Sequence, residues 1–145
     1  MCNNPVLNAV LMPKSYEANN EGIETEIILN DCDNLPFEQY DLCSLFSNLF
    51  DNAIEACKKM GDNEHKFIEI KSKNSGCYFV VKIVNSCEEV VDTKKTFFLT
   101  KRKKGHGYGM QIIKSIVSKY NGDLNIESEN GKFSVTVALK LKENE

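Results

Sequence analysis

The chain lacks an excess of positive charge, a long apolar run and a paired-cysteine motif. Its formal net charge of −3 argues against a dedicated nucleic-acid-binding protein, because phosphate contacts need a clear cationic excess. No segment approaches the ~18 consecutive apolar residues of a membrane span. The N-terminal residues also lack the basic-then-apolar order of a signal peptide. We therefore expect this stretch of sequence to be soluble.

None of the six cysteines belongs to a C-x-x-C pair, so the disulfides or metal site that they could suggest are not favoured. Cys43 and Cys57 fall within an apolar helical pattern. We expect the cysteines to be small core side chains in a reducing cytosol. The six are Cys2, Cys32, Cys43, Cys57, Cys77 and Cys87.

The hydrophobic pattern of the first half predicts two helices and a strand. Apolar residues recur at helical spacing between residues 6 and 16, but Pro13 is expected to bend or end that helix near its middle. Residues 23–29 alternate as a half-buried strand does. The strongest helix runs from 37 to 60, with apolar residues every three or four positions and Gly61 as its stop signal.

The second half predicts two hairpins and a helix. Strands over 66–73 and 77–85 are joined by residues 74–76, and strands over 123–129 and 132–141 are joined by Asn130-Gly131. A helix over 108–120 lies between the hairpins, and residues 86–104 predict a long functional loop. We therefore predict a single domain with an α+β fold. It is a two-layer α/β sandwich whose mixed, mostly antiparallel sheet is covered on one face by helices.

Two asparagines on the long helix are the first candidate binding residues. Asn48 and Asn52 stand four residues apart and share one face, where Ser44, Glu55 and Lys59 extend a polar stripe. Carboxamides at the border of a core can offer oxygens to Mg²⁺ and N–H groups to phosphate. The alternative is a solvated polar face, which these two residues alone would favour.

A glycine cluster over residues 105–110 is the second candidate. Its three glycines at alternate positions open directly into a helix, where backbone N–H groups can approach a phosphate and the helix N-terminus is partly positive. The basic run 101–104 could screen a triphosphate. The alternative is a flexible linker with a solvated basic run. The spacing fits neither a Walker P-loop nor a dinucleotide fingerprint.

Together and in this order, the two motifs resemble those of the GHKL ATPase superfamily, which includes gyrase, Hsp90, histidine kinases and MutL. Residues 47–56 resemble its N box. Residues 98–101 and then 105–110 resemble the end of its ATP lid and its G2 box. Residues 51–56 and the opening segment 4–11 are most similar to sensor histidine kinases of the Agr/Vir peptide-pheromone type, which act in quorum sensing. The resemblance covers essentially the whole chain.

The resemblance implies a role for individual residues. Asn52 would coordinate Mg²⁺, with Asn48 assisting at the metal or the phosphates. Asn85 stands where most relatives have the aspartate that binds the adenine amino group. For His106, a lid contact and a plain loop residue are equally favoured. The other implied nucleotide contacts are Lys101 in the lid, the three glycines of the phosphate-facing turn (Gly105, Gly107 and Gly109), and Tyr108 and Met110 beside them.

The chain departs from the family pattern at three places. An asparagine at position 85 accepts a hydrogen bond without charge assistance and is not followed by the usual glycines, so nucleotide affinity would be low. Glu55 stands where many histidine kinases have lysine. Ser44 replaces the glutamate of relatives that hydrolyse ATP. Without that base, phosphoryl transfer to a protein side chain is favoured over hydrolysis.

The resemblance thus predicts the catalytic domain of a two-component sensor histidine kinase. It would bind Mg²⁺-ATP and transfer the γ-phosphoryl group to a histidine on a dimerisation domain absent from this chain, with a response regulator downstream. Neither His65 nor His106 lies on a dimerisation helix, so this chain is not expected to phosphorylate itself. The alternatives are an anti-sigma-factor-type serine kinase of the same superfamily and a degenerate, non-catalytic docking module.

Residues 1–20 would be the tail and connector of the dimerisation helices, and residues 21–145 the catalytic domain. The expected location is the cytoplasmic side of a membrane-bound kinase. The full kinase is expected to be dimeric and this piece monomeric.

Overall fold

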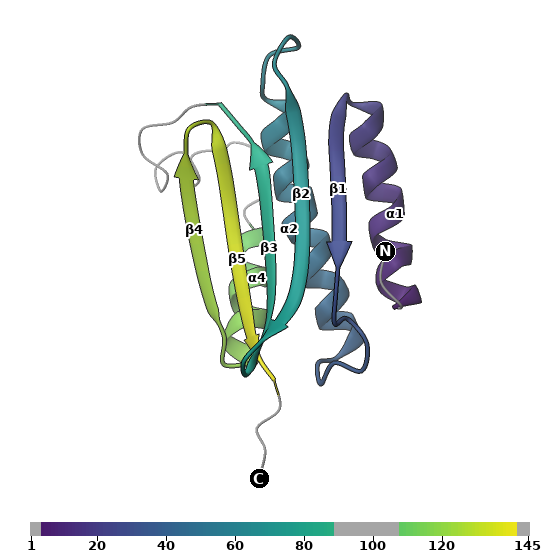
Figure 1. Cartoon of the computed structure of the whole chain (residues 1–145), viewed down its shortest axis with the longest axis vertical. Coiled ribbons are helices and arrows are strands. Elements are labelled where there is room, and N and C mark those ends of the chain that lie inside the picture. Colours follow the sequence, from purple (N-terminus) through teal and green to yellow (C-terminus); the bar gives the residue numbers. More distant parts are fainter. Residues whose placement is uncertain (1–3, 89–107, 142–145) are drawn as a thin grey trace.

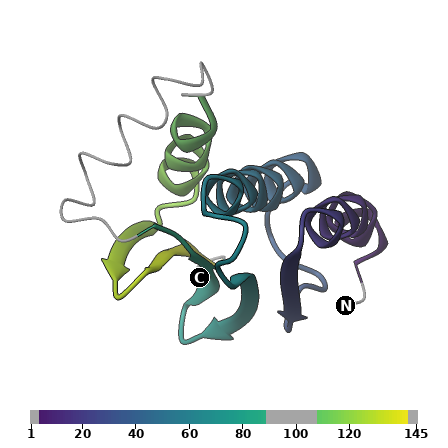
Figure 2. The same ribbon diagram turned by 90° about the horizontal axis from the view of Figure 1, so that it is seen from above.

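The computed structural model describes residues 4–88 and 108–141, which form a layer of helices against one face of a five-stranded sheet (Figures 1 and 2). The elements are α1 (Pro5–Asn20), β1 (Ile23–Leu29), α2 (Gln39–Lys58), β2 (Lys66–Ser75), β3 (Tyr78–Ser86), α4 (Tyr108–Lys119), β4 (Asp123–Glu129) and β5 (Lys132–Lys140). None of these helices is long and apolar enough to cross a bilayer. Most of the predicted loop over residues 86–104 lies outside the described residues.

The sheet has the strand order β1-β2-β3-β5-β4. β1 and β2 are parallel, because α2 crosses over between them, and the other neighbouring pairs are antiparallel. Seen from above, α1, α2 and α4 lie side by side on one side of the sheet (Figure 2). The predicted two-layer α+β sandwich with a mixed, mostly antiparallel sheet is confirmed.

Both hairpins turn at glycine. Asn130 and Gly131 have φ angles of 53° and 77°, as a type I′ turn requires. In the first hairpin β2 continues to Ser75, and Gly76, with a φ of 59°, turns the chain together with Cys77. That turn therefore begins two residues later than the sequence predicts.

The first helix does not break at Pro13. α1 runs without interruption from Pro5 to Asn20, and Asn4 caps it by accepting a hydrogen bond from the N–H of Leu7 at 3.0 Å. Leu7, Leu11 and Ala18, on both sides of Pro13, are fully buried against the rest of the domain. This burial outweighs the ~3 kcal/mol that a proline costs inside a helix, so tertiary packing overrides the local signal.

The apolar residues that suggested α1 do not all face the core. Val6 and Tyr16 are 48% and 71% exposed, and Ala18 takes the place expected of Tyr16. α1 is thus apolar on two faces, only one of which packs against α2 and β1.

The long helix α2 contributes more residues to the core than any other described element. Eight of its residues are buried, each three or four positions from another, so that one face lies against the sheet and the opposite face stays polar. Removing Phe46, which is fully buried, would cost about 3–5 kcal/mol. The eight are Leu42, Leu45, Phe46, Leu49, Phe50, Ala53, Ile54 and Cys57.

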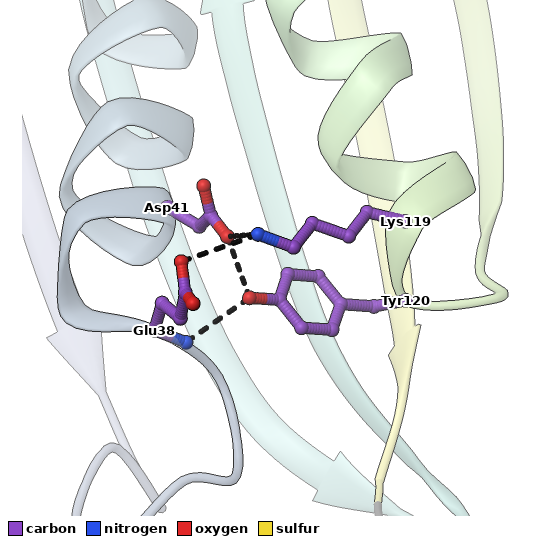
Figure 3. A network of polar contacts seen from close by, with 4 residues as sticks. All are labelled: Glu38, Asp41, Lys119 and Tyr120. Atoms are coloured by element: carbon purple, nitrogen blue, oxygen red, sulfur yellow. Dashed lines mark hydrogen bonds and ion pairs between the residues drawn. The ribbon is translucent and has the colours of Figure 1, made fainter.

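A polar network ties the end of α4 to the beginning of α2 (Figure 3). The Oδ2 atom of Asp41 accepts hydrogen bonds from Tyr120 Oη at 2.6 Å and from Lys119 Nζ at 2.7 Å. Tyr120 Oη also accepts from the N–H of Glu38 at 3.0 Å, and Lys119 Nζ donates to Glu38 Oε1 at 3.2 Å. The network lowers the pKa of Asp41, first through the bond from Lys119 and then through the bond from Tyr120. It fixes how α4 lies against α2.

No cysteine within residues 4–88 and 108–141 forms a disulfide. Cys32 and Cys57 are buried, and Cys43 and Cys87 are half-buried. The expectation of a core position is wrong for Cys77, because the first hairpin turns there and exposes its side chain.

Candidate functional site

A cavity of about 360 Å³ lies over the polar face of α2, with α1 on one side and the first turns of α4 on the other. Its floor consists of α2 residues that follow one another at helical spacing, so a single face of the helix lines it. The lining residues are Glu17, Asn48, Asp51, Asn52, Ile54, Glu55, Lys58, Tyr108, Gly109 and Ile112.

Both predicted asparagines line this cavity. Asn48 is oriented by its own helix, because its Nδ2 atom donates a hydrogen bond to the carbonyl oxygen of Ser44 at 2.7 Å. Its side-chain oxygen therefore points away from that bond. Asn52 is half-buried one turn further along. Amide oxygens at this spacing suit a hard cation such as Mg²⁺.

Two described residues of the second motif lie at the same cavity. Tyr108 and Gly109 form the beginning of α4 and line the cavity together with Asn48 and Asn52. The first N–H groups of a helix have no partner within the helix and carry a partial positive charge, which favours an anion. The fold thus joins two motifs that are far apart in the sequence, and their ligand roles stay predictions.

Two predicted nucleotide contacts do not line the cavity. Asn85 lies near the end of β3, is only 3% exposed, and donates from Nδ2 to the carbonyl oxygen of Ser86 at 2.8 Å. Met110 is also 3% exposed and belongs to the hydrophobic core. Lys101, Gly105, His106 and Gly107 lie outside the described residues.

Charged residues at the cavity are joined in pairs between α1 and α2. Lys14 Nζ is 2.6 Å from Asp51 Oδ1, and Lys58 Nζ is 3.6 Å from Glu17 Oε2. Glu55 is a third carboxylate of the lining. Sequence reasoning assigned no role to Asp51, Lys58 or Glu17. The helical spacing of Asp51 and Lys58 from Asn48 could have predicted that both lie on the same face of α2. Glu17 reaches the cavity only because α1 packs against α2.

No group of three or more His, Cys, Asp or Glu side chains that could hold a metal occurs within residues 4–88 and 108–141. A metal bound at this cavity would therefore need amide oxygens or ligand oxygens in its coordination shell. The carboxamides of Asn48 and Asn52, with Glu55 one turn beyond, fit Mg²⁺ in that way, since Mg²⁺ is held by few protein ligands together with substrate phosphates.

A second cavity, of about 340 Å³, adjoins the first between α2 and α4 and shares Tyr108 and Ile112 with it. Ser44 lines this second cavity, in the place of the glutamate expected in ATP-hydrolysing relatives. Its rim is apolar and open to solvent, because Tyr40, Tyr108 and Ile112 are 81%, 71% and 38% exposed.

Residues 37–140 match the model of the GHKL domain. Sensor histidine kinase ZraS of Escherichia coli (strain K12) is 28% identical over 148 residues, which cover 97% of this chain and 30% of that protein. Sporulation kinase C of Bacillus subtilis (strain 168) is 33% identical over 114 residues, 72% of this chain and 24% of that protein. The chain spans less than a third of the length of these relatives.

Solved structures agree on the fold. The catalytic domain of histidine kinase ThkA, in a nucleotide-free form, has a TM-score of 0.76 at 20% identity, covering 97% of this chain and 93% of that one. Full-length ShkA in complex with AMPPNP also has a TM-score of 0.76, at 14% identity, covering 97% of this chain and 30% of that one.

The fold is thus that of histidine kinase catalytic domains. The chain belongs to the GHKL domain family, and the relatives named above are a sensor histidine kinase and a sporulation kinase.

Proposed function

We propose that this domain binds Mg²⁺-ATP in the cavity between α1, α2 and α4 and transfers the γ-phosphoryl group to a histidine of another domain. The observation that carries the proposal is the meeting of Asn48 and Asn52 with the N-terminus of α4 at one cavity. Amide oxygens for a hard cation and helix N–H groups for phosphate oxygens are the groups that a metal-bound triphosphate needs. The AMPPNP in the similar ShkA structure supports a nucleotide as the ligand.

In this proposal each residue has a limited task. Asn52 holds Mg²⁺, and Asn48, oriented by Ser44, assists at the metal or the phosphates. Mg²⁺ held by these carboxamides would neutralise charge on the transferred phosphoryl group. The backbone at Tyr108 and Gly109 orients phosphate oxygens. No glutamate stands at position 44, so water is poorly activated and a histidine side chain is the better acceptor. Positioning and charge neutralisation supply most of the rate.

We propose that the acceptor domain docks at the apolar rim formed by Tyr40, Tyr108 and Ile112. This rim is continuous with the proposed nucleotide cavity, so a helix that carries a histidine and docks here would lie beside the γ-phosphate. Exposed aromatic and branched side chains are suited to bury against such a helix. Replacing Tyr40, which is 81% exposed and lines the second cavity but not the first, with alanine should weaken transfer to the acceptor while leaving nucleotide affinity unchanged.

The parent protein in this proposal is a membrane-bound, dimeric, two-component kinase of the Agr/Vir peptide-pheromone type, acting in quorum sensing through a response regulator. This proposal is supported by the amino-acid sequences of segments 4–11 and 51–56, which are most similar to kinases of that type. Residues 1–20 would continue from its dimerisation helices, and α1 would then join the acceptor domain directly to the nucleotide cavity. In the full kinase the catalytic domain would lie in the cytoplasm. Separated from the dimerisation domain, it would be a monomer.

Nucleotide binding is tested by calorimetry with AMPPNP, with and without Mg²⁺. We expect Mg²⁺-dependent binding that weakens by more than about tenfold in Asn52→Ala, the loss expected when one metal ligand is removed. Asn125→Ala is the matched control, because this exposed asparagine lies on β4 and does not line the cavity. Absence of binding at millimolar AMPPNP would leave only a non-catalytic docking role.

Phosphoryl transfer is tested with labelled ATP and a separately produced dimerisation domain of the same kinase. We expect acid-labile phosphate on that domain and none on the isolated chain. Acid-stable phosphate on the acceptor would indicate serine as the target and contradict the histidine kinase assignment.

A further inference from the structure

We infer that α1 is an electrostatic part of the nucleotide site, in which Lys14 neutralises Asp51 beside the metal-binding Asn52. This inference rests on the proposed function and extends it to a helix outside the family-model match, which begins at residue 37. It makes Lys14 a positioning residue for nucleotide binding, although its side chain does not line the cavity.

The geometry singles out this lysine. Asp51 precedes Asn52 on α2 and lines the cavity, and its Oδ1 atom is 2.6 Å from Lys14 Nζ. The Lys14 side chain is only 21% exposed, although most lysine side chains point freely into solvent. One turn further along α1, Glu17 contacts Lys58 of α2. Both ion pairs join α1 to α2. The lysine belongs to α1 in the first pair and to α2 in the second.

The cavity needs such neutralisation. Among the described residues, its lining contains the carboxylates of Glu17, Asp51 and Glu55 but only one lysine, Lys58. The magnesium complex of ATP keeps a net negative charge, so an unpaired carboxylate beside Asn52 would repel it. The Asp51 side chain is half exposed, so water screens part of this repulsion, and the low-dielectric walls of the cleft preserve the rest. The positive charge of Lys14 offsets the negative charge of Asp51, and Lys58 offsets Glu17 in the same way.

A purely structural role explains the pair less well. α1 is already held by Leu7, Leu11 and Ala18, which are fully buried. Asp51 is 53% exposed at its side chain, and ion pairs of that exposure contribute little to folding stability. The main effect of the pair is therefore expected on the ligand rather than on the fold.

The test is a double-mutant cycle on the whole chain, with AMPPNP and Mg²⁺ affinity as the readout and the melting temperature as the structural control. Lys14→Met should raise the dissociation constant about fivefold, equivalent to ~1 kcal/mol. Asp51→Asn should bind at least as tightly as the unchanged chain. The double variant should recover that affinity, and Lys14→Arg should keep it. The loss in Lys14→Met should shrink at high salt, because screening weakens the repulsion.

Lys73→Met is the matched control, since this exposed lysine lies on β2 away from the cavity and should not change affinity. If the unchanged chain binds the nucleotide but Lys14→Met binds equally well at low salt, the inference is wrong and the proposed function stands. The inference is equally wrong if the double variant stays as weak as Lys14→Met. If the unchanged chain does not bind, the proposed function fails and this inference with it. A Lys14→Met variant that fails to fold is replaced by Asp51→Asn, whose affinity must not fall.

Discussion

Removing one hydroxyl group from Tyr120 should loosen the contact between α2 and α4. In Tyr120→Phe, Asp41 loses a 2.6 Å hydrogen bond and the N–H of Glu38 loses its acceptor, while the bond from Lys119 to Asp41 remains (Figure 3). The ring can stay in place against Phe37, whose centroid is 4.8 Å away. The variant therefore isolates the polar part of the network.

The size of the effect follows from the charge and burial of Asp41. A hydrogen bond to a charged group contributes about 1.5–3 kcal/mol. The Asp41 side chain is 13% exposed, so water replaces its lost hydrogen bond only in part. Glu38 is exposed, so its backbone N–H can donate to water instead. We expect a loss of about 1.5–2 kcal/mol, which lowers the melting temperature by ~5–7 °C for a chain of this size.

The pH dependence has a definite sign. The pKa of Asp41 is lowered in the folded protein, so its contribution is fully present above the usual carboxylate pKa of about 4 and is lost as pH falls through the folded value. The difference between Tyr120→Phe and the unchanged chain should stay constant from about pH 5 to 8 and shrink below about pH 4.

Thermal unfolding followed by circular dichroism at several pH values measures this difference. Tyr40→Phe is the control, because Tyr40 lies next to Asp41 in the sequence but is 81% exposed, and it should change the melting temperature by less than about 2 °C. A Tyr120→Phe variant as stable as Tyr40→Phe, or a difference that grows towards acid pH, would refute this account of the network.

Three further changes test the packing. Gly122→Ala should lower the free energy of unfolding by about 2–3 kcal/mol in urea titration, because its Cβ atom would overlap the carbonyl oxygen of Ala138; an unchanged midpoint would contradict this packing. Pro13→Ala should raise the melting temperature, since alanine restores an N–H donor inside α1, and a fall would show that the proline is needed there. In thiol titration Cys77 should react at once, whereas Cys57, whose pKa burial raises, should react only on unfolding; fast reaction of Cys57 would contradict its burial.

Elements with strong periodicity could be predicted from the sequence. The polar face of α2 with Asn48 and Asn52 follows from its spacing, and the turn at Asn130-Gly131 follows from the positive φ that both residues tolerate. The unbroken α1 could not be predicted, because the burial of Leu7, Leu11 and Ala18 against distant residues decides it.

The site was predictable only in part. Its two motifs were recognisable because each has local chemistry, but the cavity also includes Glu17 and the ion pairs of α1, which arise from packing between helices. The network of Asp41 with Lys119 and Tyr120 joins residues about eighty positions apart, and no local pattern marks it.

The central claim is that the nucleotide lies between α2 and the start of α4. Titration of the ¹⁵N-labelled chain with AMPPNP and Mg²⁺, followed by amide chemical shifts, tests it most directly. The account predicts the largest shifts at Asn48, Asn52 and Gly109, and small ones at Val84 and Ser134, which line a separate cavity. Shifts concentrated at Val84 and Ser134, with Asn52 and Gly109 unchanged, would contradict it.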